Sequence, residues 1–213
     1  MYYHIELQTE NHQIGKEYPQ TDCLTQIHAH SLSSWEFPKF EPKIIFKLSK
    51  KAILTDFLSN SAIGARGYLV SQKAKEILIE FNLMDYQFYP VIIQTSKGEL
   101  IYFWLHLTQP DLIHEIDYRK SIFYETKWEF REDVIQINSY DDYLEKKKLD
   151  TKASFGAELD KTVVKEQFNK ELDLFTFLPF DNNIYISEKL KNSFLVNNIT
   201  GIDIEEASNL YIS

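Results

Sequence analysis

The residues that could bind a metal ion gather in one short stretch, "CLTQIHAH", which contains Cys23, His28 and His30. Thiolate and imidazole groups are ligands that zinc prefers. On a strand the two histidines would point to the same side, because alternate residues of a strand share a face. The sequence offers no second half for such a site, since Cys23 is the only cysteine and His106 and His114 stand apart. We therefore expect no metal ion and no other cofactor, and a metal-dependent enzyme using His28 and His30 is the least favoured alternative.

Motifs for nucleophilic catalysis and for phosphate binding are missing from the sequence. A nucleophile elbow, a phosphate-binding loop and a dinucleotide fingerprint each have a recognisable glycine spacing, and none of them occurs. Gly64 and Gly67 in "SAIGARGY" precede a predicted strand, whereas a phosphate-binding loop follows one, so they predict a turn. The sequence thus predicts no catalytic residue and a protein that is not an enzyme.

Acidic and aromatic side chains are mixed in the stretch "YETKWEFREDVIQINSYDDYLEKKKLD". The whole chain carries a net charge of -9, and residues 111–160 hold 13 acidic against 8 basic side chains. This balance argues against binding to nucleic acid, whose phosphates attract basic surfaces, and favours a basic partner. Aromatic residues among charged ones are typical of protein interfaces. The alternative is a solvated strand-and-loop surface with ordinary core aromatics.

Apolar patterns along the chain predict strands and helices in alternation. The clearest signal is "FYPVIIQTSKGELIYFWLHLT", two β-rich runs joined by "SKG", which predicts a hairpin with Pro90 near an edge or bulge. Helices are predicted over "LSKKAILTDFLSN", with Ser49 as a cap, and over residues 161–172. Further strands are predicted in "SIFYETKWEF", "VIQIN" and "LFTFL".

One phrase occurs twice in the chain. Residues 68–88, "YLVSQKAKEILIEFNLMDYQF", return at a constant offset as residues 184–204, "IYISEKLKNSFLVNNITGIDI". Ser71 aligns with Ser187, and each serine precedes a helical apolar stripe, so both are predicted to cap helices. The apolar positions agree between the copies while several polar ones differ. We therefore expect the phrase to build a strand, a capped helix and a second strand, and not to carry out chemistry.

Five segments occur in a fixed order between residues 48 and 206: "TDFLSN", "YLVSQKAKEILIEFNL", "YQFYPVII", "IHEIDYRKSIF" and "IYISEKLKNSFLVNNITGIDIEE". In this order they resemble a widespread bacterial family, formerly catalogued as a domain of unknown function and now grouped with the immunity proteins of polymorphic toxin systems (immunity protein eleven or forty-three type). Residues 117–121 and 187–201 are the most distinctive pieces. The resemblance implies a non-enzymatic antitoxin inside the cell, which binds and blocks the toxic C-terminal domain of a cognate effector. It carries over no catalytic residue.

An acidic chain suits a basic toxin such as a nuclease, because complementary charge speeds association and excludes wrong partners. We expect aromatic side chains to anchor this partner and carboxylates to mimic the phosphates that a nuclease grips. The predicted contact residues are Trp128, Glu129, Glu132, Asp133, Tyr140, Asp141 and Asp142. A scaffold or adaptor without a toxin partner is the alternative.

The single cysteine and an N-terminus with neither a basic start nor an apolar run predict a cytoplasmic protein. Apolar stretches such as "YFWLHL" are too short to span a membrane, so no membrane partner is expected. The predicted fold class is α+β, with antiparallel hairpins and short strands flanked by about four helices. These elements form either a single domain over residues 1–213 or two lobes, about 1–120 and 121–213, each with one copy of the repeated phrase.

Overall fold

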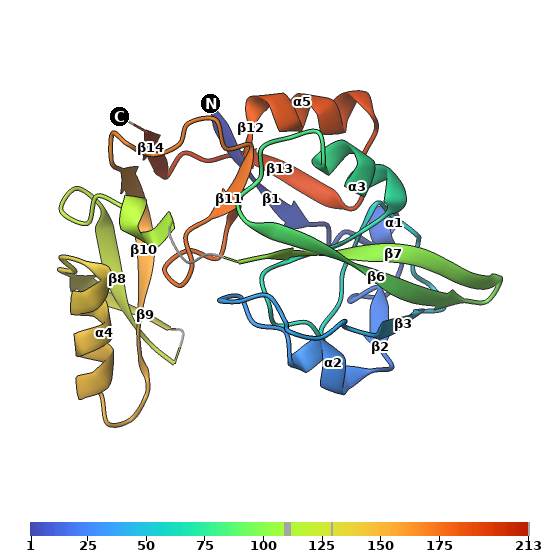
Figure 1. The fold of residues 1–213 in the computed structure, drawn as a ribbon, viewed down its shortest axis with the longest axis horizontal. Helices are drawn as coiled ribbons and strands as arrows, with labels where there is room; N and C mark the ends of the chain where they lie inside the picture. The colour runs from blue at the N-terminus through green and yellow to red at the C-terminus, as the bar shows by residue number, and fades with distance from the viewer. Residues whose placement is uncertain (109–111, 129, 213) are drawn as a thin grey trace.

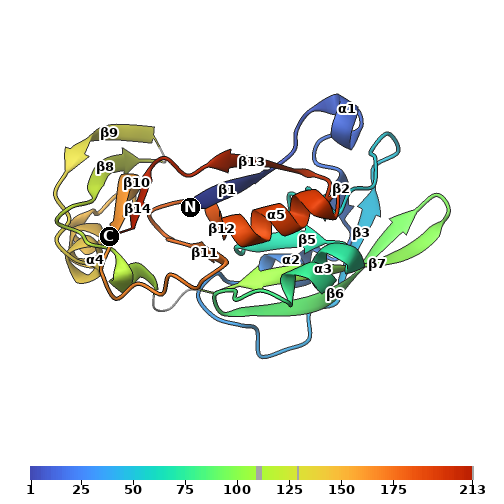
Figure 2. The same cartoon turned by 90° about the horizontal axis from the view of Figure 1, so that it is seen from above.

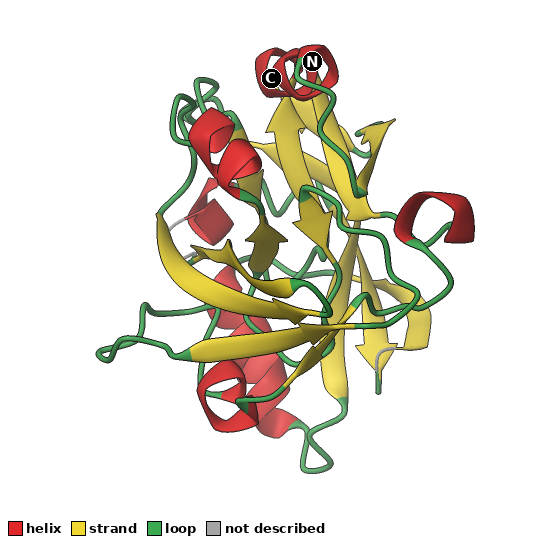
Figure 3. Ribbon diagram, turned by 90° about the vertical axis from the view of Figure 1, so that its right-hand side faces the viewer, coloured by secondary structure: helices red, strands yellow, loops and turns green. Residues whose placement is uncertain are grey.

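Strands dominate the computed structural model of this protein, which describes residues 1–108, 112–128 and 130–212, with the backbone alone at residues 26 and 27. The predicted α+β class is confirmed, because the strands form antiparallel and mixed sheets and the helices lie around them (Figures 1 and 3). The described residues form five α-helices, where the sequence predicts about four. They are α1 (Asn11–Ile14), α2 (Gln26–His30), α3 (Gln72–Leu78), α4 (Tyr140–Leu149) and α5 (Glu188–Val196), and one 3-10 helix, η1 (Leu112–Glu115), comes in addition.

The largest sheet contains the hairpin that the sequence predicts most clearly. Its strands lie in the order β2 (Thr21–Cys23), β3 (Ile44–Leu48), β6 (Tyr86–Thr95), β7 (Gly98–Leu107), β5 (Gly67–Val70) and β4 (Phe57–Leu58). β6 and β7 form the hairpin, and the sheet is mixed because β3 runs parallel to β6. Pro90 precedes the start of the β3 pairing at Val91, so β6 loses no ladder bond to β3 there.

Both faces of this large sheet are buried except at the tip of the β6–β7 hairpin, where the first four residues of β7 are exposed. Leu69 and Trp104 on one face pack with Ala29 of α2, whereas Val70 and Leu105 on the other join the main core. The first forty residues, which the family resemblance does not cover, thus provide β2 at one edge and α2 over one face. They are part of the fold and not an appendage to it.

The second sheet joins the two ends of the chain. Its strands lie in the order β11 (Leu174–Thr176), β12 (Ile184–Ser187), β1 (Tyr2–Leu7) and β13 (Ile202–Glu206). β1, from the start of the chain, lies between β12 and β13, from its end, and runs antiparallel to both (Figure 2). The two lobes suggested at about 1–120 and 121–213 are therefore interwoven, because the first strand belongs to the sheet of the last ones.

The third sheet and α4 stand at one end of the molecule (Figure 1). The order of its strands is β14 (Leu210–Ile212), β10 (Phe155–Val164), β8 (Ile122–Lys127) and β9 (Phe130–Ile135). Tyr143 fixes α4 to this sheet, since its ring contacts Phe155 of β10 and, at 4.8 Å between centroids, the buried Phe180. The strand predicted in "SIFYETKWEF" is confirmed as β8. The strand predicted in "VIQIN" is only partly right, because β9 contains Val134 and Ile135 but begins at Phe130 and ends before Gln136.

The repeated phrase builds the same supersecondary unit in two sheets. In the first copy β4, β5, α3 and β6 give the spatial order β4-β5-β7-β6, and in the second β11, β12, α5 and β13 give β11-β12-β1-β13. In both, the strands before and after the helix are parallel, with one antiparallel strand between them. β1 takes the place in the second unit that β7 takes in the first. The two helices, α3 and α5, lie next to each other.

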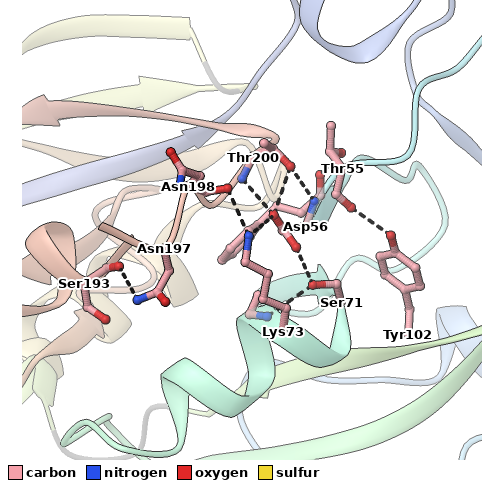
Figure 4. A network of polar contacts seen from close by, with 11 residues as sticks. Thr55, Asp56, Ser71, Lys73, Tyr102, Ser193, Asn197, Asn198 and Thr200 are labelled. Atoms are coloured by element: carbon pink, nitrogen blue, oxygen red, sulfur yellow. Dashed lines mark hydrogen bonds and ion pairs between the residues drawn. The ribbon is translucent and has the colours of Figure 1, made fainter. Parts of the chain in front are cut away.

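Each repeated unit also carries an aspartate that holds both its own helix cap and a loop of the other unit, and Figure 4 shows the first of them, Asp56. Asp56 accepts a hydrogen bond from Ser71 Oγ (2.7 Å) in its own unit and from the Thr200 N–H (3.1 Å) after α5. Asp173 accepts a hydrogen bond from Ser187 Oγ (2.5 Å) in its own unit. It accepts another from the Asn82 backbone N–H (3.1 Å), in the loop after α3 of the other unit. The units are thus tied together reciprocally.

Both predicted helix caps are confirmed. Ser71 Oγ accepts a hydrogen bond from the Ala74 N–H (3.1 Å), and Ser187 Oγ accepts one from the Leu190 N–H (3.2 Å). Each hydroxyl also donates its only proton to its aspartate, so both serines are engaged in the cap and its link to the aspartate. The serines of the repeated phrase are structural.

We expect Ser187→Ala to cost more stability than Ser71→Ala, although both remove the same cap. Ser187 and Asp173 are buried, so the variant leaves a buried carboxylate short of a donor, which adds to the lost cap and gives about 2–4 kcal/mol. Ser71 is half-buried, and water can replace its hydroxyl, so about 1 kcal/mol is expected. Urea unfolding of the two variants measures the difference, and equal losses would contradict the assignment.

Two predicted helices are wrong. In the stretch "LSKKAILTDFLSN" the chain completes β3, turns at residues 49–51 and enters β4, because Phe57 and Leu58 pair with β5. Residues 161–164 belong to β10, and a turn-rich segment follows. In both cases a helical spacing of apolar residues is overridden by pairing with distant strands, and the β-branched run Thr162, Val163 and Val164 favours a strand in any case.

Candidate partner interface

The β8–β9 hairpin presents an outer strand that is almost wholly exposed. β9 is at the edge of the third sheet and pairs with β8 alone, with a bulge opposite Glu125. Five of its six residues are exposed. Two of these are apolar: Phe130 is 76% and Val134 is 61% exposed. Trp128, which precedes the strand, is 65% exposed. Phe130 lies opposite Lys127 and Val134 opposite Tyr124, so the bulge places the two side chains on opposite faces of this edge strand. Exposed large apolar side chains on an edge strand are candidates for contact with a partner.

Three of the seven predicted contact residues lie on this hairpin, and a fourth falls outside the described residues. Trp128 has a positive φ of 52° and donates its backbone N–H to the Ser154 carbonyl (3.1 Å). Glu132 and Asp133 are exposed on β9. Within the described parts of the chain they have no ion-pair partner. Glu129 is the residue outside the described ranges.

The other three predicted residues form the first turn of α4. The side chains of two of them already make contacts with other residues of the protein. Tyr140 stacks on Tyr143 at 5.9 Å between centroids, and burial raises its pKa. Asp142 accepts hydrogen bonds from the Asn138 backbone N–H (2.8 Å) and side chain, pairs with Lys146, and has a lowered pKa chiefly because of that backbone bond. Asp141 is exposed. Of this group only Asp141 offers its charge to a partner unhindered.

The two groups lie at opposite ends of β9. Trp128 precedes the first residue of the strand, and Tyr140 begins the helix that follows its last residue, so a strand of about 20 Å lies between them. Figure 1 shows α4 beginning at the end of β9 away from the β8–β9 connection. The structure therefore places Trp128, Glu132 and Asp133 on one hairpin and sets the α4 group apart.

Phe130 and Val134 belong to the surface but are not among the residues predicted to contact a partner. Apolar residues in an alternating strand pattern indicate a buried face, and nothing in their own types distinguishes them from core residues. Their exposure follows from the position of β9 at the sheet edge, which depends on which strands pair. The only local signal is their mixture with the charged residues of "FREDVI".

Arg131 is fixed in place and does not present a free positive charge. Its guanidinium donates to Glu158 and, at 2.9 Å, to Asp160, both on β10, and it lies 4.4 Å from the centroid of the Tyr124 ring. The hydrogen bond with Glu158 and the second carboxylate raise its pKa. Arg131 therefore braces β9 across β8 to β10, and the net charge of this face is set by the acids.

The histidine pair predicted as a possible metal site lies on a helix and not on a strand. His28 and His30 are two residues apart in α2, where successive side chains turn by about 100°, so the pair diverges. His28 Nδ1 instead accepts the Lys43 backbone N–H at 3.4 Å. Across the described residues no group of three or more potential ligands is placed to hold a metal ion.

Residues 117–121, the most distinctive inner segment of the family resemblance, form a turn that leads from η1 into β8. The Asp117 carboxylate accepts the backbone N–H groups of Arg119 (3.2 Å) and Lys120 (3.3 Å), and its ion pair and hydrogen bond with the Lys120 side chain lower its pKa. Ser121 Oγ accepts the Val163 N–H at 3.0 Å. These contacts fasten β8 to β10. They account for Asp117 and Ser121 without a bound ligand.

None of the helices in the described residues is long and apolar enough to cross a membrane. No family model matches the chain, and no curated protein matches it. The family resemblance stays a prediction that rests on the five segments.

Proposed function

We propose that the protein is an immunity protein, which binds the toxic C-terminal domain of a cognate bacterial effector in the cytoplasm and blocks it without catalysis. The observation that carries this proposal is the exposed outer strand of the β8–β9 hairpin. It carries Trp128, Phe130 and Val134 together with Glu132 and Asp133, whose carboxylates have no ion-pair partner among the described residues. We name these five residues the hairpin surface.

The hairpin surface has the composition of an interface core with a charged rim. Covering an exposed aromatic or branched side chain contributes about 1.5–3 kcal/mol when burial is complete, so its three apolar residues supply a sizeable part of a stable complex. They are costly to leave exposed unless a partner covers them, because they favour aggregation. The surface therefore supports a binding function more directly than a purely structural one.

The charge of the same region favours a basic partner. The ranges of β8, β9 and β10 contain five acidic and three basic side chains, and Arg131 is already held by Glu158 and Asp160. Long-range attraction between an acidic inhibitor and a basic enzyme increases the association rate, more than it increases the final affinity. A toxin that itself binds a phosphate backbone, such as a nuclease, fits this charge.

Co-expression tests the function. The C-terminal domain of the polypeptide encoded directly upstream of this gene should stop growth of a bacterial host, and this chain should restore growth and form a complex with the purified domain. Immunity requires both results. If the domain is toxic and the chain neither rescues growth nor binds it, the antitoxin proposal is wrong and a scaffold or adaptor role takes its place.

The same assay tests the surface with variants of matched charge. Glu132→Lys combined with Asp133→Lys should slow association with the domain by about 10-fold or more at low salt, because the steering charge is reversed. Glu76→Lys combined with Glu80→Lys, on exposed positions of α3 and just after it, changes the net charge equally at a distance. This control should associate at nearly the wild-type rate, and equal effects of the two variants would show that only net charge matters.

A further inference from the structure

β9 leaves one side of its backbone unpaired in the described structure. It pairs with β8 and no other strand. In an antiparallel pair, alternate residues direct both the N–H and the C=O away from the neighbouring strand. Lys127 and Phe130 lie opposite each other and close the hairpin, so Arg131 is the first residue with outward groups. After the bulge, Val134 opposite Tyr124 is the next.

Among the described strands that stand at the outside of a sheet, β9 is the longest, with six residues. The strands at the other edges have two, three or five residues: β4, β2, β14, β11 and β13. The longest of these, β13, carries Asp203, Glu205 and Glu206 and no residue of the exposed apolar kind seen on β9. Proteins usually protect long edges with proline, lysine, other charges, bulges or a short strand. "FREDVI" contains neither proline nor lysine, and what limits pairing along β9 is its bulge and the charges of Glu132 and Asp133.

The charges of β9 determine which strand the edge can accept. Glu132 and Asp133 stand next to each other without a described ion-pair partner. If two copies of the protein paired through β9, these carboxylates would approach their own counterparts, and like charges on paired strands are destabilising. An extended segment with lysine or arginine side chains would meet opposite charge instead. The edge therefore rejects a second copy and accepts a basic strand.

We propose that the toxin docks by strand addition, with a basic, extended segment of the toxic domain pairing with the free edge of β9. This proposal rests on the proposed immunity function and adds to it the way in which the partner is held. Main-chain hydrogen bonds to the outward groups of Arg131 and Val134, one on each side of the bulge, hold the added strand. Glu132 and Asp133 select basic side chains, and Trp128 and Phe130 cover the added strand or its neighbours.

Amide hydrogen exchange of the complex distinguishes strand addition from binding through side chains alone. Only strand addition places the outward amides of β9 in hydrogen bonds and slows their exchange. The probe is the purified toxic domain used for the growth assay. In the free protein the outward amides of Arg131 and Val134 should exchange rapidly, and in the complex they should slow by about 100-fold or more. A complex that restores growth while both amides exchange as in the free protein would overturn strand addition and leave the immunity function standing. Absence of any complex would end both proposals.

A proline at the edge provides a second, independent measurement. Val134→Pro removes one outward N–H, and proline is tolerated at edge positions. Val134→Ala removes nearly the same side chain but keeps the N–H, so it is the matched control. We expect Val134→Pro to bind the domain about 10-fold or more weakly than Val134→Ala. Equal affinities would contradict strand addition, and if the proline variant does not fold, the exchange of the wild-type complex decides.

Discussion

Replacing Gly67 by alanine should prevent the protein from folding under conditions in which the wild type is stable. Gly67 begins β5 with a φ of +145°, which residues with a side chain rarely adopt. A Cβ atom there would lie 1.8 Å from the backbone oxygen of Leu105, an atom fixed by the pairing of β5 with β7. Neither the strain nor the overlap can relax without separating the two strands, so we expect a loss above about 4 kcal/mol. Soluble yield, circular dichroism and urea unfolding measure it.

Gly64→Ala is the matched control three residues away. A Cβ at Gly64 would meet no atom within 4 Å, and its backbone is not in the left-handed region. The variant should leave stability unchanged or raise it by about 0.4–1 kcal/mol, because alanine restricts the unfolded chain. A free energy of unfolding of Gly67→Ala within about 1 kcal/mol of the wild-type value would contradict this prediction. It would mean that β5 does not approach β7 as closely as described.

The elements of this protein that the sequence predicts correctly are those that short-range chemistry determines. The β6–β7 hairpin is determined by two apolar runs and a short connection, and the caps at Ser71 and Ser187 by a serine placed directly before a helical stripe. Gly64 and Gly67 are predicted together as turn residues. Only the structure distinguishes them, since the requirement at Gly67 comes from Leu105, which is far away in the chain.

The repeated phrase is visible in the sequence, but the full extent of the supersecondary unit that it builds is not. Asp56 and Asp173 lie outside the aligned copies, at a spacing to their serines that differs by one residue. Their reciprocal bonds to Thr200 and Asn82 become visible only when both units are folded against each other. The same holds for β1, whose place between β12 and β13 no local pattern could predict.

The sequence directs the prediction of contact residues to positions 128–142, but the structure separates these residues in space. Proximity in sequence does not mean proximity in space. Tyr140 and Asp142 turn inward to anchor α4, whereas Phe130 and Val134 turn outward because β9 has no outer neighbour. Exposure of an apolar residue on a strand depends on sheet order, which is a long-range property.

Removing the ring of Phe180 should have the second large effect on stability, and it should be greatest around α4. Phe180 is almost fully buried, and its ring contacts Tyr118 at 6.0 Å, Phe123 at 5.3 Å and Tyr143 at 4.8 Å. It thereby joins the third sheet to the helix that follows β9. Phe180→Ala removes these contacts and leaves a cavity, for which we expect a loss of about 3–5 kcal/mol. Urea unfolding gives the total, and hydrogen exchange should show the amides of α4 opening before those of α3 and α5.

Phe130→Ala separates this packing role from the proposed binding role, because it removes the same ring from an exposed position. Phe130 is 76% exposed, so its loss should change the free energy of unfolding by less than about 0.5 kcal/mol. Its affinity for the toxic domain should fall by about 10-fold or more, as expected for an aromatic anchor. Binding to Phe180→Ala, measured at a temperature where it is folded, should be less affected, since Phe180 cannot touch the partner. If Phe130→Ala loses stability and keeps its affinity, β9 is covered by the protein itself and the toxin binds elsewhere.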